Sequence, residues 1–232
     1  MSTIRLRRGI ELTNPLELAL RFLAAYSISD TAPSRLTSFD EADLRLANRG
    51  GARISAAEIA AILERRGEIE GALCEIDPGA SLSGATSSIP WAPLRRLFDA
   101  FADIRGVGFS KMTKALHGKR PALIPMLDSV VQEYLTAAEI RTGGSESFGQ
   151  RAIVLVRSYK RDLDRNRSAL REIQQELANR TYDLTEVRIL DLLIWSASAP
   201  SEQVGGRASP RSPLRPSRGA NQRKRAGKRT RS

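Results

Sequence analysis

Apolar residues recur every three or four positions in one segment of this chain after another, and this periodicity constrains the fold more than any other feature. Near the start, Leu16, Leu20 and Leu23 form one such stripe behind Asn14 and Pro15, residue types that open helices. No segment alternates apolar and polar residues for long enough to indicate a strand. The sequence therefore predicts an all-α fold with two helical lobes. The helices are expected within residues 13–27, 40–49, 55–76, 91–104, 110–117, 128–140, 148–180 and 184–198. Gly67 is a candidate break in the third of these segments, and residues 148–180 are expected to form one long helix or a helix pair.

The composition excludes several classes of site. The 232-residue chain has one cysteine, Cys74, and one histidine, His117. An internal disulfide and a metal or iron–sulfur site rich in Cys or His are therefore excluded, and no cofactor or metal is expected. No stretch approaches the ~20 apolar residues that a membrane span needs, and the segment MSTIRLRRGIELTNP is too polar for a signal peptide. We expect a cytoplasmic, nucleoid-associated monomer without membrane contact.

Positive charge is concentrated at the C-terminal end of the sequence. Residues 201–232 contain ten Lys/Arg and the single acidic residue Glu202, so they carry +9 of the formal net charge of +11. Because this segment has almost no apolar residues to bury, we expect a helical domain over 1–200 and a disordered tail over 201–232. Such a tail neutralises phosphates and binds nucleic acid without sequence preference. A solvated extension, or attraction to ribosomes and RNA, is the alternative.

A tight glycine turn joins two of the expected helices. The apolar face of the first helix leads directly into Gly106-Val107-Gly108, and the segment SKMTKALH begins the second helix at once. Helix, turn and helix over residues 94–118 form the pattern of a helix–hairpin–helix. The two glycines permit left-handed backbone angles and close approach to another surface, and Val107 can tuck between the helices. The unpaired N–H groups at the start of the second helix suit a phosphate oxygen.

Basic residues follow the turn and favour DNA as the ligand, although short glycine turns between helices are common. A dinucleotide-binding loop is excluded, because it would need a preceding strand and a third glycine at the position of Lys111. No Walker-type loop is present either. The residues expected to contact DNA phosphates are Gly106, Val107, Gly108, Ser110, Lys111, Lys114, Lys119 and Arg120.

An isolated aspartate comes next. Pro121 and Pro125 interrupt the helix, since the residue before a proline is held extended, and Asp128 then stands at the head of the helix expected over 128–140. Aspartate is a favoured N-cap, worth ~1 kcal/mol, so capping alone can explain its presence. A carboxylate presented beside a phosphate-binding hairpin is also a candidate catalytic group, and the two roles can coexist.

The segment over residues 97–135 resembles the helix–hairpin–helix (HhH-GPD) DNA glycosylase superfamily. There a Gly-Val-Gly hairpin is followed after 22 residues by an aspartate at the head of the next helix, and Gly106 to Asp128 is also 22 residues. The segment IPMLDSVVQEYL is similar to that family's Pro-hydrophobic-hydrophobic-Asp-x-x-Val segment. The run SKMTKALHGKRPALIPMLDSVV also resembles a bacterial family of unknown function with a Ser-Lys…Lys-Arg-Pro…Pro-x-x-Asp signature. The resemblance implies DNA as partner and Asp128 as the catalytic carboxylate.

Two departures from the superfamily pattern restrict the expected activity. Bifunctional members carry a Schiff-base lysine two residues after the second hairpin glycine, and Ser110 occupies that position here. Lys111 is one residue further on, which turns it by ~100° around the helix, so it is no automatic substitute. Members with an iron–sulfur cluster have four C-terminal cysteines, which this chain lacks. The resemblance therefore implies a monofunctional, metal-free enzyme.

Other side chains have weaker claims to function. Trp91 and Tyr26 are candidates for stacking on an extruded base, although packing explains such residues more often. Trp195 is expected in the core, and a phosphate contact or a helix C-terminal position explains His117 equally well. The basic residues of the helix or helix pair over 148–180 are candidates for a second basic face, with a solvated helix carrying Asp162 and Asp164 as the alternative. Its members would be Arg157, Lys160, Arg161, Arg165 and Arg167.

These observations predict a DNA glycosylase that hydrolyses the N-glycosidic bond of a damaged or modified base, in repair or in defence against modified phage DNA. Asp128 would stabilise positive charge on the sugar and activate the attacking water. The base must first leave double-stranded DNA, which requires a firm hold on the flanking phosphates. The alternative is a DNA-binding protein that has the hairpin without catalysis.

Overall fold

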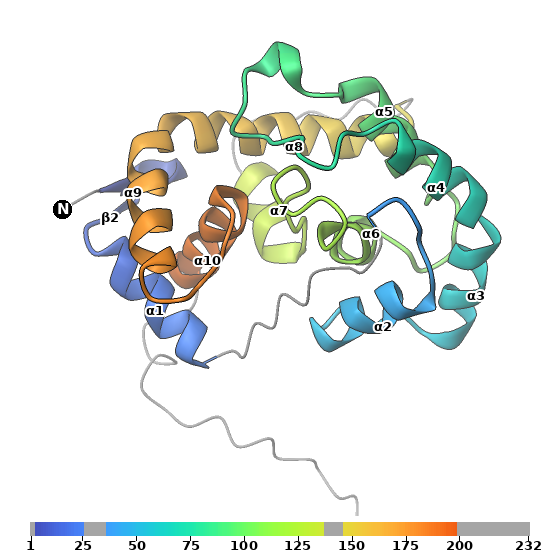
Figure 1. The fold of residues 1–232 in the computed structure, drawn as a ribbon, viewed down its shortest axis with the longest axis horizontal. Helices are drawn as coiled ribbons and strands as arrows, with labels where there is room; N and C mark the ends of the chain where they lie inside the picture. The colour runs from blue at the N-terminus through green and yellow to red at the C-terminus, as the bar shows by residue number, and fades with distance from the viewer. Residues whose placement is uncertain (1–2, 26–35, 137–145, 199–232) are drawn as a thin grey trace, which may run out of the picture. The chain divides into compact units, whose positions relative to one another are not determined.

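A computed structural model describes residues 3–25, 36–136 and 146–198 (Figure 1), and over these residues the all-α prediction is confirmed. None of their helices is long and apolar enough to cross a membrane. The helices are α1 (Pro15–Ala25), α2 (Glu41–Arg49), α3 (Ala56–Glu64), α4 (Arg66–Cys74), α5 (Trp91–Asp99), α6 (Phe109–His117), α7 (Ser129–Thr136), α8 (Phe148–Arg165), α9 (Arg167–Ala178) and α10 (Glu186–Ser198), with short 3-10 helices η1 (Arg7–Gly9) and η2 (Thr86–Ser88).

Helix ends follow the local signals in the sequence. Asp40 and Ser55 each form a complete capping box, at the starts of α2 and α3. The break expected at Gly67 comes two residues earlier, because the chain kinks at Arg65 between α3 and α4. The expected segment over residues 148–180 is a pair of helices that part at Asn166.

One element was not predicted, a small antiparallel hairpin that precedes α1. Strand β1 (Ile4–Arg5) pairs with β2 (Glu11–Leu12), with Ile4 opposite Leu12. Two residues per strand are too few to produce a detectable alternation of apolar and polar residues. Tertiary contacts rather than strand propensity therefore hold this hairpin in place.

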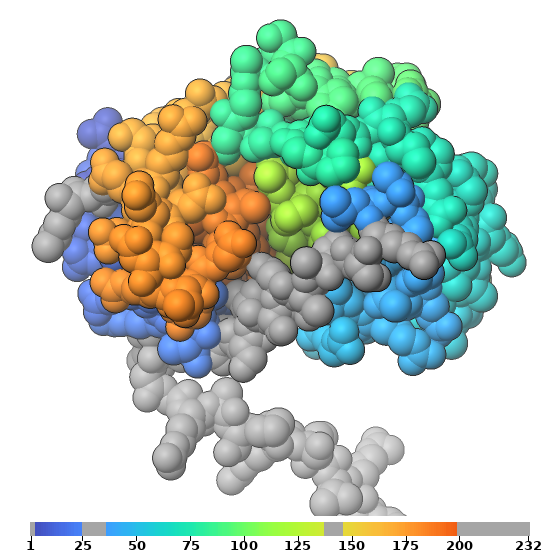
Figure 2. Space-filling view, viewed as in Figure 1, coloured from blue at the N-terminus to red at the C-terminus, as the bar shows by residue number. Residues whose placement is uncertain are grey.

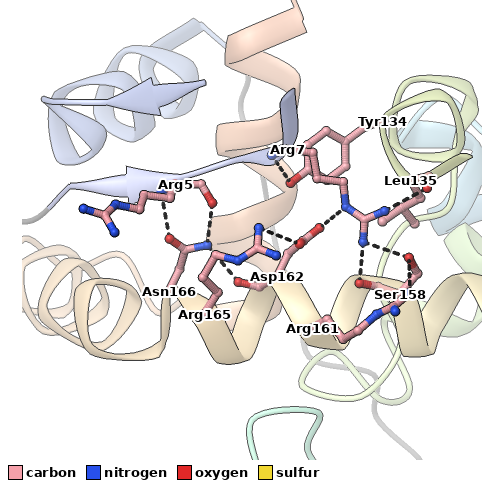
Figure 3. Close-up of polar contacts among 9 residues, drawn as sticks. All are labelled: Arg5, Arg7, Tyr134, Leu135, Ser158, Arg161, Asp162, Arg165 and Asn166. Carbon is pink, nitrogen blue, oxygen red and sulfur yellow. Dashed lines mark hydrogen bonds and ion pairs between the residues drawn. The ribbon is translucent and has the colours of Figure 1, made fainter. Parts of the chain in front are cut away.

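Arg7, between the two strands, anchors this hairpin to the helices (Figure 3). Its Nε donates to Asp162 Oδ2 at 2.6 Å, and its Nη1 donates to the backbone oxygen of Leu135 at 2.8 Å. Its Nη2 donates to the backbone and hydroxyl oxygens of Ser158, both at 2.8 Å. Asp162 is fully buried, and Arg165 also pairs with it at 3.3 Å. The guanidinium thus satisfies buried acceptors on both α7 and α8.

The helices form two groups that share one hydrophobic core. Helices α2 to α6 lie on one side in Figure 1, and α1, α9 and α10 lie on the other, while α8 runs past both. In Figure 2 the yellow-green surface of the α7 region lies between the orange surface of α9 and α10 and the blue surface of α2. Because one continuous cluster of buried side chains joins both groups, Met1–Pro200 is a single compact unit. The two predicted lobes are therefore parts of one domain.

The segment between α6 and α7 is fixed by buried polar contacts. Arg120 is fully buried, and its guanidinium donates to the backbone oxygens of Leu36, Leu73 and Ile76, each at 2.8 Å, and to that of Lys119 at 2.7 Å. These hydrogen bonds satisfy backbone oxygens of three separate parts of the chain and hold the segment in its path toward α7.

Two predicted DNA contacts are wrong for this reason. Arg120 faces the interior, and the Lys119 side chain is buried in an ion pair with Asp43 Oδ1 at 2.6 Å. A DNA phosphate cannot reach either cation without opening the domain. His117 is also buried, and its Nδ1 lies 2.7 Å from the backbone oxygen of Ile124. Burial lowers the pKa of His117 to about 4, so at neutral pH the ring carries no charge that could attract a phosphate.

Candidate functional site

A pocket of about 660 Å³ unites the hairpin with Asp128. Four parts of the chain line it: the turn before α3, the hairpin and start of α6, the start of α7, and α10. Six of the predicted site residues are among those that line it, although they span more than 20 positions in the sequence. The lining residues are Gly51, Ala52, Arg53, Gly106, Gly108, Ser110, Lys111, Lys114, Asp128, Ser129 and Trp195.

Asp128 both caps α7 and faces this pocket. It is 6% exposed, and its Oδ1 accepts a hydrogen bond from the backbone N–H of Val131 at 3.1 Å. Val131 is the third residue of α7, so this bond is an N-cap. The second oxygen, Oδ2, accepts from the indole Nε1 of Trp195 at 2.8 Å. Two donors from different helices thus hold the carboxylate in one orientation inside the pocket.

Trp195 is the site residue that sequence reasoning missed. It was expected in the core, yet 38% of it is exposed and it lines the pocket. The stripe RILDLLIW is typical of a buried helix face, and the partner Asp128 lies 67 residues away in the sequence. No local signal could therefore have paired them.

Of the two hairpin glycines, only Gly106 needs to be glycine for its conformation. Gly106 has a φ of +84°, a left-handed value that other residues adopt at a cost. Gly108 has a φ of −101° and a ψ of −174°, ordinary extended backbone, so the expectation of left-handed angles there is wrong. Open space surrounds Gly108, and it is the N-cap of α6 without a side-chain hydrogen bond. Val107 is buried between the helices as predicted.

A carboxylate already occupies the anion-binding side of the hairpin. Both oxygens of Glu58 accept hydrogen bonds from Lys111 Nζ at 2.7 Å, and Oε2 also accepts from the backbone N–H of Ser55 at 2.8 Å. The same carboxylate packs against Gly106, where a Cβ atom would overlap Glu58 Oε1. The hydrogen bond from Lys111 is the main cause of the lowered pKa of Glu58. Lys111 is thus at the predicted place, but Glu58 neutralises it.

Lys114 lies one turn beyond Ser110 and Lys111 on α6, and all three residues line the pocket. Its Nζ donates a long hydrogen bond, 3.4 Å, to the backbone oxygen of Gly51. Burial lowers its pKa, the Asp128 charge raises it, and the charges of Arg188 and Arg53 lower it again. Lys114 is therefore a partly buried cation that shares the pocket with Asp128.

A second buried carboxyl holds the chain just before Asp128. Asp191 on α10 accepts a hydrogen bond at Oδ2 from the backbone N–H of Met126 at 3.2 Å. Burial raises the pKa of Asp191 to about 7, against the opposing effect of the Arg188 charge. Asp191 therefore helps to fix the backbone two residues before Asp128.

The remaining candidates lie elsewhere. Trp91 does not line the pocket; its Nε1 donates to the backbone oxygen of Thr86 at 3.1 Å, and the Arg157 guanidinium stacks on its ring. Tyr26 is outside the described residues. Among the described residues, no group of three or more His, Cys, Asp or Glu could hold a metal ion.

The predicted basic face of α8 and α9 is largely neutralised by acidic neighbours. Lys160 and Arg167 both pair with Asp164, and Arg165 pairs with Asp162. The alternative of a helix threaded with its own carboxylates therefore describes this surface better than a second DNA-binding face.

Comparison with known proteins gives one match. Residues 23–198 match a family of unknown function, DUF6308, and this segment includes α2 to α10 and every residue that lines the pocket. No curated protein and no solved structure matches the chain. Since the matched segment covers most of the 232 residues, the chain belongs to the DUF6308 family.

Proposed function

We propose that this protein is a monofunctional DNA glycosylase that removes a damaged or modified base by hydrolysis, with Asp128 as its catalytic carboxylate. The observation that carries the proposal is the single pocket lined by both the hairpin and Asp128. In such an enzyme, the hairpin that binds the DNA backbone and the carboxylate that faces the sugar must lie close together in space. The resemblance to the HhH-GPD superfamily points in the same direction.

Asp128 suits the chemistry of N-glycosidic cleavage. As the base leaves, positive charge develops on the deoxyribose, and a fixed carboxylate stabilises that charge without reorganising. The same carboxylate can take a proton from the water that attacks C1′. The hydrogen bonds from Val131 and Trp195 supply the fixed orientation that both steps need.

The pocket suits an extruded base. Its volume of about 660 Å³ lies within the ~300–1,000 Å³ that is usual for ligand pockets. The exposed part of Trp195 offers an aromatic surface on which a base can stack. Trp195 replaces Trp91 as the base-pocket candidate, because Trp91 lies outside the pocket.

In this proposal, both the hairpin backbone and nearby positive charges bind the DNA phosphates. Gly106, Gly108 and Ser110 bring backbone close to the pocket mouth, and Arg53, Lys111 and Lys114 add three cations. The Lys/Arg-rich segment 201–232 would add affinity that is independent of sequence. Glu58 opposes this hold, since a phosphate that pairs with Lys111 must displace its carboxylate.

Glu58→Gln should therefore tighten binding to double-stranded DNA. Glutamine keeps the capping box of α3 but releases Lys111 to pair with a phosphate. Each additional neutralised phosphate steepens the log–log dependence of affinity on salt by ~0.9, so we expect a slope steeper by about one contact and a several-fold higher affinity at low salt. Fluorescence anisotropy of a labelled oligonucleotide across a salt series measures both.

Glu64→Gln is the matched control for this experiment. Glu64 is exposed on the same helix, so the substitution makes the same change in net charge away from the hairpin. Equal gains in DNA affinity in the two variants would mean that the change in net charge alone causes the gain, and that no phosphate binds at Lys111.

A second function, a non-catalytic DNA-binding protein, has one observation in its favour. Asp128 Oδ1 caps α7 in the ordinary way, and that role accounts for an aspartate at this position. The two candidates differ in whether the protein releases a base.

Base release is tested directly by mass spectrometry. The full chain is incubated with duplexes that carry uracil, oxidised, alkylated or hypermodified bases, and free bases and the DNA product are quantified. We expect release of one class of base, an intact abasic site and no borohydride-trapped covalent complex, since Ser110 occupies the Schiff-base position. Binding to these duplexes without any release would support the non-catalytic alternative.

A further inference from the structure

Lys114 differs from its neighbour Lys111 in its partners. Lys111 is held by both oxygens of Glu58 at 2.7 Å. Among the residues that the structure describes, no carboxylate forms an ion pair with Lys114, and its Nζ makes only the 3.4 Å contact with the Gly51 backbone oxygen. A half-buried ammonium with such weak hydrogen bonding can still donate its protons to a ligand in the pocket.

The surroundings of Lys114 weaken its hold on a proton. Burial disfavours the charged form, and the charges of Arg188 on α10 and Arg53 before α3 act in the same direction. The carboxylate of Asp128 at the start of α7 opposes them, but the pKa of Lys114 remains below its usual 10.5. An acid whose pKa is shifted toward neutral transfers its proton more readily than an exposed lysine.

We propose that Lys114 is a second catalytic residue, which gives its proton to the base as the base leaves. The inference rests on the proposed function. The bond between C1′ and the base nitrogen breaks, its electron pair goes to the base, and a proton from Lys114 Nζ neutralises the resulting anion. Water forms the new bond to C1′, and its proton goes to Asp128. The products are the neutral free base and an abasic site; Asp128 then releases its proton to solvent, and solvent reprotonates the neutral amine of Lys114.

This role specifies a class of substrate. A neutral base departs as an anion and gains from a proton donor, whereas a cationic alkylated base departs neutral and needs none. Arg53 and Lys114 line the pocket together, and neither forms an ion pair with a carboxylate among the described residues, so they would also repel a positively charged base on entry. The expected substrates are therefore neutral damaged or modified bases.

The test compares leaving groups in single-turnover reactions at saturating protein. The substrates are matched duplexes with uracil, 5-fluorouracil, which leaves more easily, and the cationic base 7-methylguanine. The variants are Lys114→Met and Lys114→Arg, with Arg45→Met as a control that removes an exposed cation on α2. Thermal melting establishes that each variant is folded.

Lys114→Met should slow release of uracil by about 10²-fold, within the range for general acid catalysis, and slow release of 5-fluorouracil much less. The wild-type rate should fall as pH rises through the pKa of Lys114, because the proton is then lost. Lys114→Arg keeps the positive charge but does not titrate there, so its rate should be low and independent of pH in that range. Arg45→Met should match the wild type.

Several outcomes would overturn the role of Lys114. Equal slowing of uracil and 5-fluorouracil release would rule out proton donation, and a rise in half-saturating concentration without slower release would make Lys114 a phosphate contact. A borohydride-trapped adduct on Lys114 would make it a nucleophile, and release of 7-methylguanine alone would contradict the substrate class. If the wild type releases no base from these duplexes or from the wider panel described above, the proposed function fails as well. If the wild type releases a base and the Lys114 variants release it at the wild-type rate, this inference fails alone.

Discussion

Asp128→Asn should slow base release by on the order of 10²- to 10³-fold, the usual loss when one preorganised electrostatic contact to a transition state is removed. Asparagine has nearly the same shape, but it carries no negative charge to face the developing oxocarbenium ion and takes no proton from water. DNA affinity should be unchanged or slightly higher, since one negative charge near the phosphates is gone. Single-turnover release at saturating protein separates the rate from the affinity.

The same variant should also lose ~1 kcal/mol of stability, because an asparagine has a single acceptor oxygen. Both carboxylate oxygens of Asp128 accept hydrogen bonds, from Val131 N and from Trp195 Nε1, and one of these donors would be left without its acceptor. Asp183→Asn, at an exposed position before α10, is the matched control and should affect neither quantity. A wild-type rate in Asp128→Asn would remove Asp128 from the chemistry and leave it only as the cap of α7.

Arg7→Met should lower the free energy of unfolding by ~3 kcal/mol, the lower end of the range for breaking a buried ion pair. The variant removes four hydrogen bonds and leaves Asp162, which is fully buried, without its 2.6 Å ion-pair partner; the Arg165 guanidinium remains at 3.3 Å. Urea unfolding followed by circular dichroism measures the change. Since Arg7 is distant in sequence from the pocket and does not line it, base release should persist below the unfolding transition.

Two further variants show whether the buried charge causes this loss. Arg5→Met removes an exposed arginine from the same hairpin and should change stability by less than ~0.5 kcal/mol. The double variant Arg7→Met with Asp162→Leu removes both charges and should be more stable than Arg7→Met alone, because no unpaired carboxylate remains buried. A double variant less stable than the single one would show that the remaining contacts of Asp162 matter more than its charge.

Local sequence was sufficient for most of the helices. Asp40 and Ser55 cap their helices through bonds to residues two and three positions away, so these signals can be read without knowing the fold. The kink at Arg65 shows the limit of such signals, since the nearby Gly67 suggested a different position. The hairpin β1–β2 had no local signal and depends on hydrogen bonds from Arg7 to Leu135 and from Arg5 to Asn166, which join residues more than 120 positions apart.

The candidate site also has features that local sequence predicts and features that it does not. The turn at Gly106 and the cap at Asp128 were predictable, because a left-handed glycine and an N-cap are decided within three or four residues. Whether a cation is available to a ligand was not predictable. Lys111, Lys119 and Arg120 all follow the hairpin, yet the first pairs with Glu58, the second pairs with Asp43, and the third is buried among backbone oxygens.

The availability of a charged side chain depends on which distant groups the fold brings within hydrogen-bonding distance. Glu58 lies 53 residues before Lys111, and Trp195 lies 67 residues after Asp128. Hydrogen bonds and ion pairs act over about 3–4 Å in space, regardless of separation along the chain. The amino-acid order therefore specified the helices, the hairpin turn and the aspartate that caps α7. The packing of α3, α6, α7 and α10 determined that Lys114 shares the pocket with Asp128 and forms no ion pair among the described residues.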